Sequence, residues 1–182
     1  MKIICLDIDG VLNCELAYKR GYCKYVDIGG GKHYQTFYPP AKRFLNDLID
    51  ITEAKIVLSS SWRAGGLEWF RKVWKAEDMA GEVIDITPFR DDRFRGFEIK
   101  EWLNNMGFQH INWSKELQQE YMDKSGIENY VILDDDSDML YEQKDNFIHV
   151  LPSPRNLSGF KSVYYYRALK ILNKTIIDIK YK

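Results

Sequence analysis

Two aspartates follow a short apolar segment at the start of the chain, and their spacing indicates metal chemistry. Residues 2–6 form an Ile-rich apolar run that predicts a buried strand, and Asp7 and Asp9 come directly after it. Because side chains alternate along a strand, both carboxylates would lie on one side, where they repel by about 4 kcal/mol at ~4 Å and an effective dielectric of ~20. A bound Mg²⁺, which takes carboxylate oxygens, would offset this repulsion. The competing interpretation is a strand that ends in an ordinary Asp-Gly turn.

Two other predicted strands also end in polar residues. The apolar run over 54–58 leads into Ser59, Ser60, Ser61, Trp62 and Arg63. The run over 129–133 leads into four acids in five positions, Asp134, Asp135, Asp136 and Asp138. Hydroxyl and guanidinium groups suit a phosphate, and carboxylates suit a cation. Ligands of open α/β sheets bind at the carboxyl ends of the strands, so we expect the three strand ends to meet in one site.

Apolar periodicity along the rest of the chain predicts an alternation of strands and helices. Strands are predicted over 83–86 and 147–150, the second at a sheet edge, and helices over 41–49, 67–74, 97–106, 115–124 and 167–172. This alternation predicts the α/β class, with a central, mostly parallel sheet flanked by helices. At 182 residues, the length favours a single domain over residues 1–182.

Two segments interrupt this alternation. Residues 14–40 follow the Asp7 strand and contain Gly29-Gly30-Gly31, and residues 107–126 form a polar insertion. A long segment inside a compact domain is usually functional or mobile, so residues 14–40 are a candidate flap over the site. The alternative is a small surface hairpin around the glycines.

The composition limits the classes of function. Hydrophobic residues make up 45% of the sequence and charged residues 29%, as in ordinary soluble globular proteins. The formal net charge of −1 gives no bulk attraction for nucleic acid, so a polyanion must be bound by a local patch. Three cysteines without CxxC spacing indicate neither a disulfide framework nor structural zinc, and they favour a reducing, cytoplasmic setting. No apolar stretch approaches the ~20 residues of a membrane helix.

The ordered set of polar strand ends resembles the haloacid dehalogenase (HAD) superfamily of aspartate-nucleophile phosphotransferases. Residues 7–13 are similar to its first motif, the serine run to its second, and Asp134, Asp135 and Asp138 to its fourth. The segments LDIDGVLN, IVLSSSWR, RGFEIKEWL and YVILDDDSDM together resemble the branch found in RNA repair proteins, over about residues 1–173. The resemblance implies a Rossmann-like HAD fold with a small cap or none, because the two insertions are too small for a large cap domain.

For the chemistry, the resemblance implies phosphoryl transfer through an aspartate. Asp7 is the expected nucleophile and Asp9 the expected general acid and base. Mg²⁺ would be held by Asp7, by the backbone carbonyl of Asp9 and by Asp134, with Asp135 or Asp138 as a further ligand. The sequence leaves open which members of the acidic run face the metal.

The resemblance also implies which residues bind the phosphoryl oxygens. Ser60, Arg63 and Arg95 are expected in this role. Three serines in a row leave the register open, so either neighbour could take the place of Ser60. Arg95 is favoured over Lys100 as the motif cation, because it stands where related sequences often carry lysine.

An open site, together with the resemblance, implies a phosphomonoester hydrolase acting on the 3′-phosphate ends of RNA or DNA. The alternative within enzymes is a nucleotide or small-metabolite phosphatase. The alternative from another class is a catalytically idle domain that binds phosphorylated ends. The expected cofactor is Mg²⁺ and the expected partner is a phosphorylated substrate, with no membrane; the sequence does not give the oligomeric state.

Overall fold

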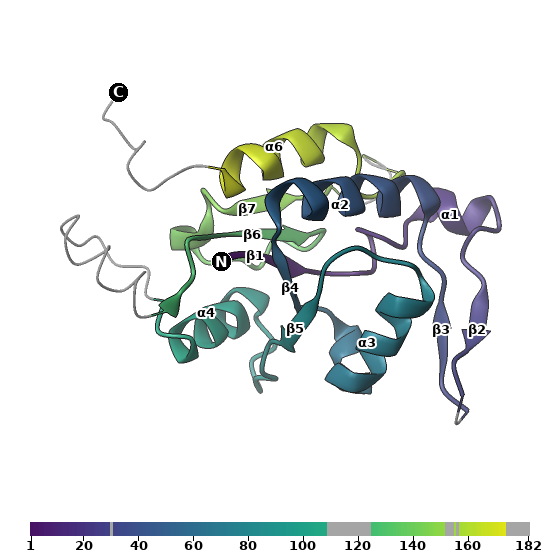
Figure 1. Cartoon of the computed structure of the whole chain (residues 1–182), viewed down its shortest axis with the longest axis horizontal. Helices are drawn as coiled ribbons and strands as arrows, with labels where there is room; N and C mark the ends of the chain where they lie inside the picture. The colour runs from purple at the N-terminus through teal and green to yellow at the C-terminus, as the bar shows by residue number, and fades with distance from the viewer. Residues whose placement is uncertain (30, 109–124, 152–154, 156, 174–182) are drawn as a thin grey trace.

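The computed structural model describes residues 1–29, 31–108, 125–151, 155 and 157–173, and a five-stranded sheet lies at its centre (Figure 1). The strands are β1 Lys2–Leu6, β4 Lys55–Leu58, β5 Val83–Ile86, β6 Asn129–Asp134 and β7 Phe147–His149. Their order is β5-β4-β1-β6-β7, and every pairing is parallel. The predicted α/β class with a central parallel sheet is therefore confirmed, and β7 lies at an edge as predicted.

β1 occupies the middle of the sheet, between β4 and β6. Its last residue, Leu6, is level with Leu58 of β4 and Leu133 of β6. Backbone hydrogen bonds continue this alignment beyond the strand, because Asp7 N–H donates to the Leu133 carbonyl at 2.9 Å and Ser59 N–H donates to the Leu6 carbonyl at 2.8 Å. The residues that follow the three central strands therefore emerge together at one edge of the sheet.

Helices cover both faces of the sheet (Figure 1). They are α2 Pro39–Thr52, α3 Leu67–Ala76, α4 Arg95–Asn105 and α6 Ser162–Leu172. In β1, Ile4 and Leu6 join the apolar core under α2, α3 and α6, whereas Ile3 and Cys5 join the core under α4. A strand that is apolar on both faces is typical of a parallel sheet covered on two sides.

The structure defines where three helices begin, and the start of α4 differs from the sequence prediction. α2 begins at Pro39, which is tolerated in a first turn because its missing N–H would have no helical partner there. α4 begins at Arg95, whose N–H donates to Asp138 Oδ2 at 2.8 Å. α6 begins at Ser162 and contains residues 167–172, which were predicted to belong to the final helix.

Residues 14–40 fold as a short helix and a β-hairpin at one end of the molecule (Figure 1). α1 Glu15–Lys19 is followed by β2 Tyr25–Asp27 and the antiparallel β3 His33–Gln35. Gly29 and Gly31, in the connecting turn, have φ angles of 95° and 72°, a conformation that favours glycine. The hairpin interpretation is confirmed, and the role of this segment as a flap stays a prediction.

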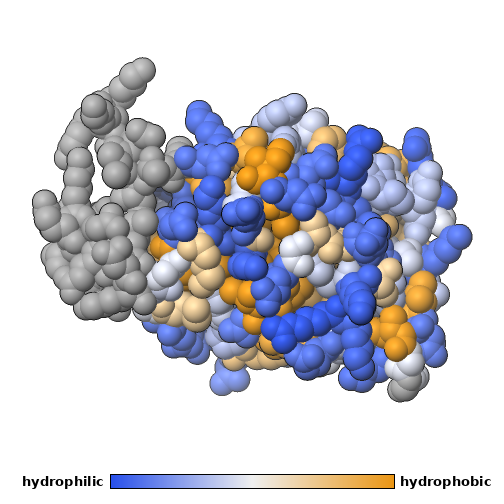
Figure 2. Space-filling model, viewed as in Figure 1, coloured by the Kyte–Doolittle hydropathy of each residue, from blue (hydrophilic) through white to orange (hydrophobic). Residues whose placement is uncertain are grey.

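The described residues also include the 3₁₀ helices η1 Ser61–Gly65, after β4, and η2 Tyr141–Gln143, before β7. The helix predicted over 115–124 lies outside the described residues. The face shown in Figure 2 is covered mostly by hydrophilic residues, with smaller apolar patches between them. No helix within the described ranges is long and apolar enough to span a membrane.

Candidate active site

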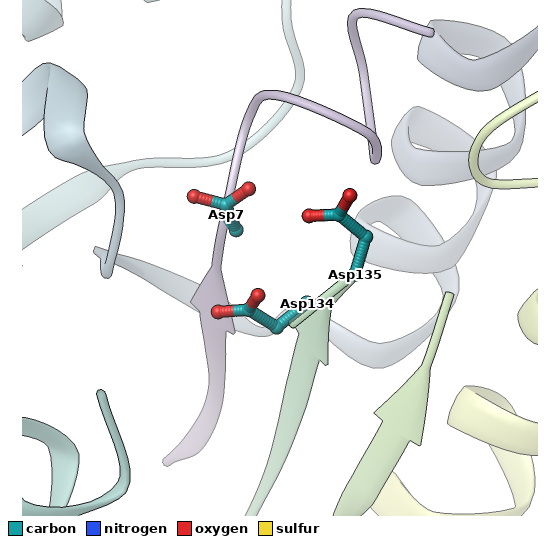
Figure 3. A group of neighbouring side chains, drawn as sticks. All are labelled: Asp7, Asp134 and Asp135. Atoms are coloured by element: carbon teal, nitrogen blue, oxygen red, sulfur yellow. The ribbon is translucent and has the colours of Figure 1, made fainter. Parts of the chain in front are cut away.

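Three carboxylates meet at the carboxyl edge of the sheet (Figure 3). Asp7 follows β1, and Asp134 and Asp135 lie at the end of the adjacent β6. One oxygen from each side chain lies within 4.8 Å of the others. Asp7 is 6% exposed and Asp134 1%, and Asp135 is half-buried. The alignment of the central strands thus brings three of the predicted metal ligands together, and we call them the carboxylate cluster.

Burial and mutual repulsion make these carboxyl groups hold protons more tightly than usual. Burial is the largest cause of the raised pKa of Asp134, and the charge of Asp7 adds to it. Burial also raises the pKa of Asp7, against the opposing effects of the Arg95 charge and a hydrogen bond with Ser60. The pKa of Asp135 is raised to about 6, mainly by burial. At neutral pH such a cluster is best stabilised by additional positive charge.

The carboxylate cluster has the donor set that a hard cation requires. Asp134 Oδ2 is buried and accepts no hydrogen bond from the described residues. Its other oxygen, Oδ1, accepts the backbone N–H of Asp136 at 2.9 Å, which orients the carboxylate. Mg²⁺ takes oxygen ligands and often only one or two carboxylates. The residues therefore fit the predicted ion, with Asp7, Asp134 and Asp135 as candidate side-chain ligands.

Gly10 makes room for Asp135. Its φ angle is 78°, and a Cβ atom added there would lie 2.2 Å from Asp135 Cγ. Glycine is therefore required at this position for two reasons, the backbone conformation and the close approach of the Asp135 carboxylate.

The other two acids of the run point elsewhere. Asp136 is exposed. Asp138 Oδ2 accepts the backbone N–H of Arg95, the first residue of α4. Asp138 therefore helps to position the end of the helix that carries Arg95, and it lies outside the carboxylate cluster.

Arg95 faces the carboxylate cluster from α4. Its Nη2 is 3.9 Å from Asp7 Oδ1, and its Nε is 3.5 Å from Asp134 Oδ2. Its Nη1 is 3.6 Å from Glu98 Oε2, is buried, and has no hydrogen-bond partner in the part of the chain that the structure describes. Lys100 instead forms an ion pair at the surface of α4. Of the two cations that the sequence left open, Arg95 is the one beside Asp7.

Arg63 is buried, and its guanidinium group is already engaged by the protein. Nη2 is 2.6 Å from Glu98 Oε1, and Nη1 donates to the Ser60 carbonyl at 3.0 Å. The guanidinium carbon lies 4.2 Å from the centre of the Phe89 ring. Burial and the neighbouring charge of Arg95 lower the pKa of Arg63. The Nε–H group of Arg63 is buried and has no hydrogen-bond acceptor among the described residues.

The three serines after β4 occupy different environments. Ser60 forms a side-chain hydrogen bond with Asp7, and its Oγ accepts the backbone N–H of Trp62 at 3.4 Å. Ser59 is fully buried, and its hydroxyl has no hydrogen-bond partner within the described ranges. Ser61 is exposed at the start of η1. The serine that contacts the predicted nucleophile is therefore Ser60.

Asp9 lies on the solvent side of the site. Its side chain is exposed, and its Oδ2 accepts the indole N–H of Trp62 at 3.0 Å. A buried Asp7 beside an exposed Asp9 suits two roles, because a nucleophile is best shielded from water whereas a proton carrier must exchange protons with it. The predicted contribution of Asp9 to the metal is through its backbone carbonyl, not through this side chain.

Two residues of the site were missed by the sequence analysis. Glu98 is 1% exposed and contacts both Arg63 and Arg95. The sequence could have indicated this role, because Glu98 is opposite in charge to Arg95 and follows it by three residues on a predicted helix. Side chains at this spacing lie on one face of a helix. Trp62 donates a hydrogen bond to the Asp9 carboxylate. Its position between the serine run and Arg63 in the sequence could have indicated this role.

A parallel sheet whose central strand ends in a buried aspartate, opposite two aspartates of the next strand, is the arrangement expected for a HAD-type domain. The chain belongs to the family described as the HAD domain in Swiss Army Knife RNA repair proteins, whose model matches residues 3–156. Comparisons with curated proteins and with solved structures give no match. The resemblance noted from the motifs, including the RNA repair branch, is thus confirmed.

Proposed function

We propose that this protein hydrolyses phosphomonoesters with the help of Mg²⁺, through an aspartyl-phosphate on Asp7, and that its substrates are the 3′-phosphate ends of nucleic acids. One observation carries the proposal: Asp7 is buried in a carboxylate cluster that fits a cation, with the Arg95 guanidinium beside it. Membership in a family of HAD domains from RNA repair proteins supports the hydrolase class and the nucleic-acid context.

In the first step, a carboxylate oxygen of Asp7 bonds to phosphorus while the bond from phosphorus to the ester oxygen breaks. Asp9 donates a proton to the leaving oxygen, which for a 3′ end becomes the 3′-hydroxyl group. Arg95 and Ser60, which both contact Asp7, bind the non-bridging oxygens as charge develops on them. When held by the carboxylate cluster, Mg²⁺ supplies the charge that lets an anionic nucleophile approach an anionic phosphate.

In the second step, Asp9 takes a proton from water, and the water oxygen bonds to phosphorus. The bond between phosphorus and Asp7 breaks, which restores the carboxylate and releases inorganic phosphate. The hydrogen bond from Trp62 keeps the Asp9 carboxylate in one orientation during both proton transfers.

Exposed aromatic side chains near the site support a nucleic-acid substrate. Phe89, whose ring lies against Arg63, is 62% exposed. Tyr18 is 46% exposed, and burial followed by the charge of Asp9 raises its pKa to about 12. Aromatic faces are the surfaces on which the bases of single strands stack.

The test compares Mg²⁺-dependent phosphate release from strands of one sequence that carry phosphate at the 3′ or the 5′ end, with nucleoside monophosphates alongside. We expect the fastest release from 3′-phosphate ends, and none with Asp7→Asn. Faster release from the nucleoside monophosphates would replace the proposed substrate with nucleotides. Binding of phosphorylated ends without release by the unaltered protein would contradict the enzymatic role.

A further inference from the structure

A groove lies beside the candidate active site, between the β2–β3 hairpin and the start of α3. Its volume is about 640 Å³, within the range of roughly 300–1,000 Å³ that is usual for ligand pockets. The two elements that form it are neighbours in Figure 1. It is lined from the hairpin by Ile28, Gly29 and Lys32, and from η1 and α3 by Gly65, Gly66, Leu67, Glu68, Trp69 and Lys72.

Two neighbouring indoles, tilted by 46° to each other, link the site to the groove. Trp62, which donates to the Asp9 carboxylate, has its ring 6.0 Å from the ring of Trp69. Trp69 in turn lines the groove. A chain whose end reaches Asp9 therefore needs to extend only past these two rings to enter the groove. Gly65 permits this arrangement, because a Cβ atom there would lie 2.2 Å from Trp69 Cε3.

The groove has a local positive charge that the whole molecule lacks. Lys32 approaches from the hairpin and Lys72 from α3, and neither forms an ion pair with another described residue. The acid of the lining, Glu68, is 2.6 Å from the Arg71 guanidinium, which offsets its charge. Two lysines around an aromatic ring suit a strand of alternating phosphates and bases.

We propose that this groove binds the single-stranded segment of nucleic acid that precedes the terminal phosphate, with phosphates at Lys32 and Lys72 and a base against Trp69. The inference rests on the proposed function, since it states where the rest of the same substrate, beyond the reacting phosphate, binds. The groove gives the enzyme a preference for strands over mononucleotides without a net positive charge on the protein. Lys32 and Lys72 lie 40 positions apart in the sequence, so the fold alone brings them together.

The first test measures binding of the reaction product, a strand of about eight nucleotides with a 3′-hydroxyl and a 5′ fluorophore, by fluorescence anisotropy. We expect the double variant Lys32→Gln/Lys72→Gln to raise the Kd about five- to tenfold and to make the slope of log K against log salt shallower by about 1.4. Lys75→Gln is the matched control, because Lys75 is exposed on the same helix and outside the groove. Trp69→Leu should weaken binding by about fivefold or more.

The second test measures the ratio of kcat/KM for a 3′-phosphorylated strand to kcat/KM for an aryl phosphate, and we expect the double variant to lower this ratio. RNA and DNA strands are compared to identify the preferred sugar. Equal Kd values for the double variant and the Lys75→Gln control, or no strand binding at all, would overturn the groove assignment. Lysine-dependent binding without any phosphate release from 3′ ends would leave the groove standing and overturn the proposed function.

Discussion

At the scale of single residues, Glu98 offsets the positive charges of two arginines, Arg63 and Arg95, by pairing with both. Burial and then the charge of Arg95 lower the pKa of Arg63, and Glu98 contacts both arginines, at 2.6 and 3.6 Å. Because Glu98 and Arg63 are almost fully buried, their charges are poorly compensated by water. We therefore propose that Glu98 is a positioning residue, which holds the two arginines expected to bind phosphate and does not itself contact the phosphate.

Glu98→Gln should destabilise the protein and impair catalysis together. Removal of one partner of a buried ion pair costs about 3–5 kcal/mol, and the freed arginines should raise KM for the phosphate ester. Denaturant unfolding and steady-state kinetics measure the two effects. Glu101→Gln on the same helix is the control, because its pair with Arg90 lies at the surface, where water and salt weaken an ion pair. Equal unfolding free energies for the two variants would contradict the role of Glu98.

At the scale of elements, a buried acid makes one of the contacts that hold the β2–β3 hairpin to the body of the protein. Glu77, after α3, is 6% exposed and accepts the Tyr34 hydroxyl at 3.0 Å. The same carboxylate accepts the backbone N–H of Phe37 at 3.4 Å and lies 3.2 Å from Lys42 Nζ. The hairpin therefore depends on this contact to keep its side of the groove in place.

Tyr34→Phe should loosen the hairpin while the central sheet stays intact. The variant leaves a Glu77 oxygen without its donor, and an unmet buried acceptor costs about 1–3 kcal/mol. Hydrogen exchange should become faster in residues 25–35 and stay unchanged in β1. Tyr25→Phe serves as the control, because Tyr25 is in the same hairpin and 75% exposed. Unchanged exchange in residues 25–35 would show that other contacts hold the hairpin.

The sequence predicted the elements well because parallel strands are continuous apolar runs with polar ends. The run before Asp7, the run before Ser59 and the run before Asp134 became the three central strands, and the parallel arrangement placed their ends together. The choice among the four acids could not be predicted, since β6 ends at Asp134 and strand alternation no longer applies beyond it. Contacts between distant segments, such as Arg63 with Glu98, depend on the packing of α4 and leave little trace in local patterns.

At the scale of the whole molecule, the carboxylate cluster should make stability depend on pH and on metal. Burial raises the pKa of Asp134 in the folded state above the unfolded value of about 4. The folded protein therefore keeps a proton that the unfolded chain releases, so this contribution is fully present below about pH 4 and is lost as pH rises through the raised pKa. Mg²⁺ would bind the deprotonated form, so its expected stabilising effect should grow with pH.

The thermal midpoint of the metal-free protein should therefore fall between about pH 5 and pH 8, and Mg²⁺ should raise it more at the higher pH. Asp134→Asn removes the cost of keeping this buried carboxyl protonated, so at about pH 8 without metal the variant should be more stable than the unaltered protein by about 1 kcal/mol or more, roughly 2–4 °C. Asp136→Asn is the control, since Asp136 is exposed. A variant at position 134 that responds to Mg²⁺ as the unaltered protein does would remove Asp134 from the metal site.

Asp7 is the residue proposed to become phosphorylated, and the most direct measurement is to trap this intermediate. The protein is mixed with Mg²⁺ and a 3′-phosphorylated strand and quenched in acid, and its peptides are then analysed by mass spectrometry. We predict a peptide that carries one phosphoryl group on Asp7, which is absent without Mg²⁺ and absent in Asp7→Asn. Steady phosphate release without any phosphorylated Asp7, or release that persists in Asp7→Asn, would contradict the account.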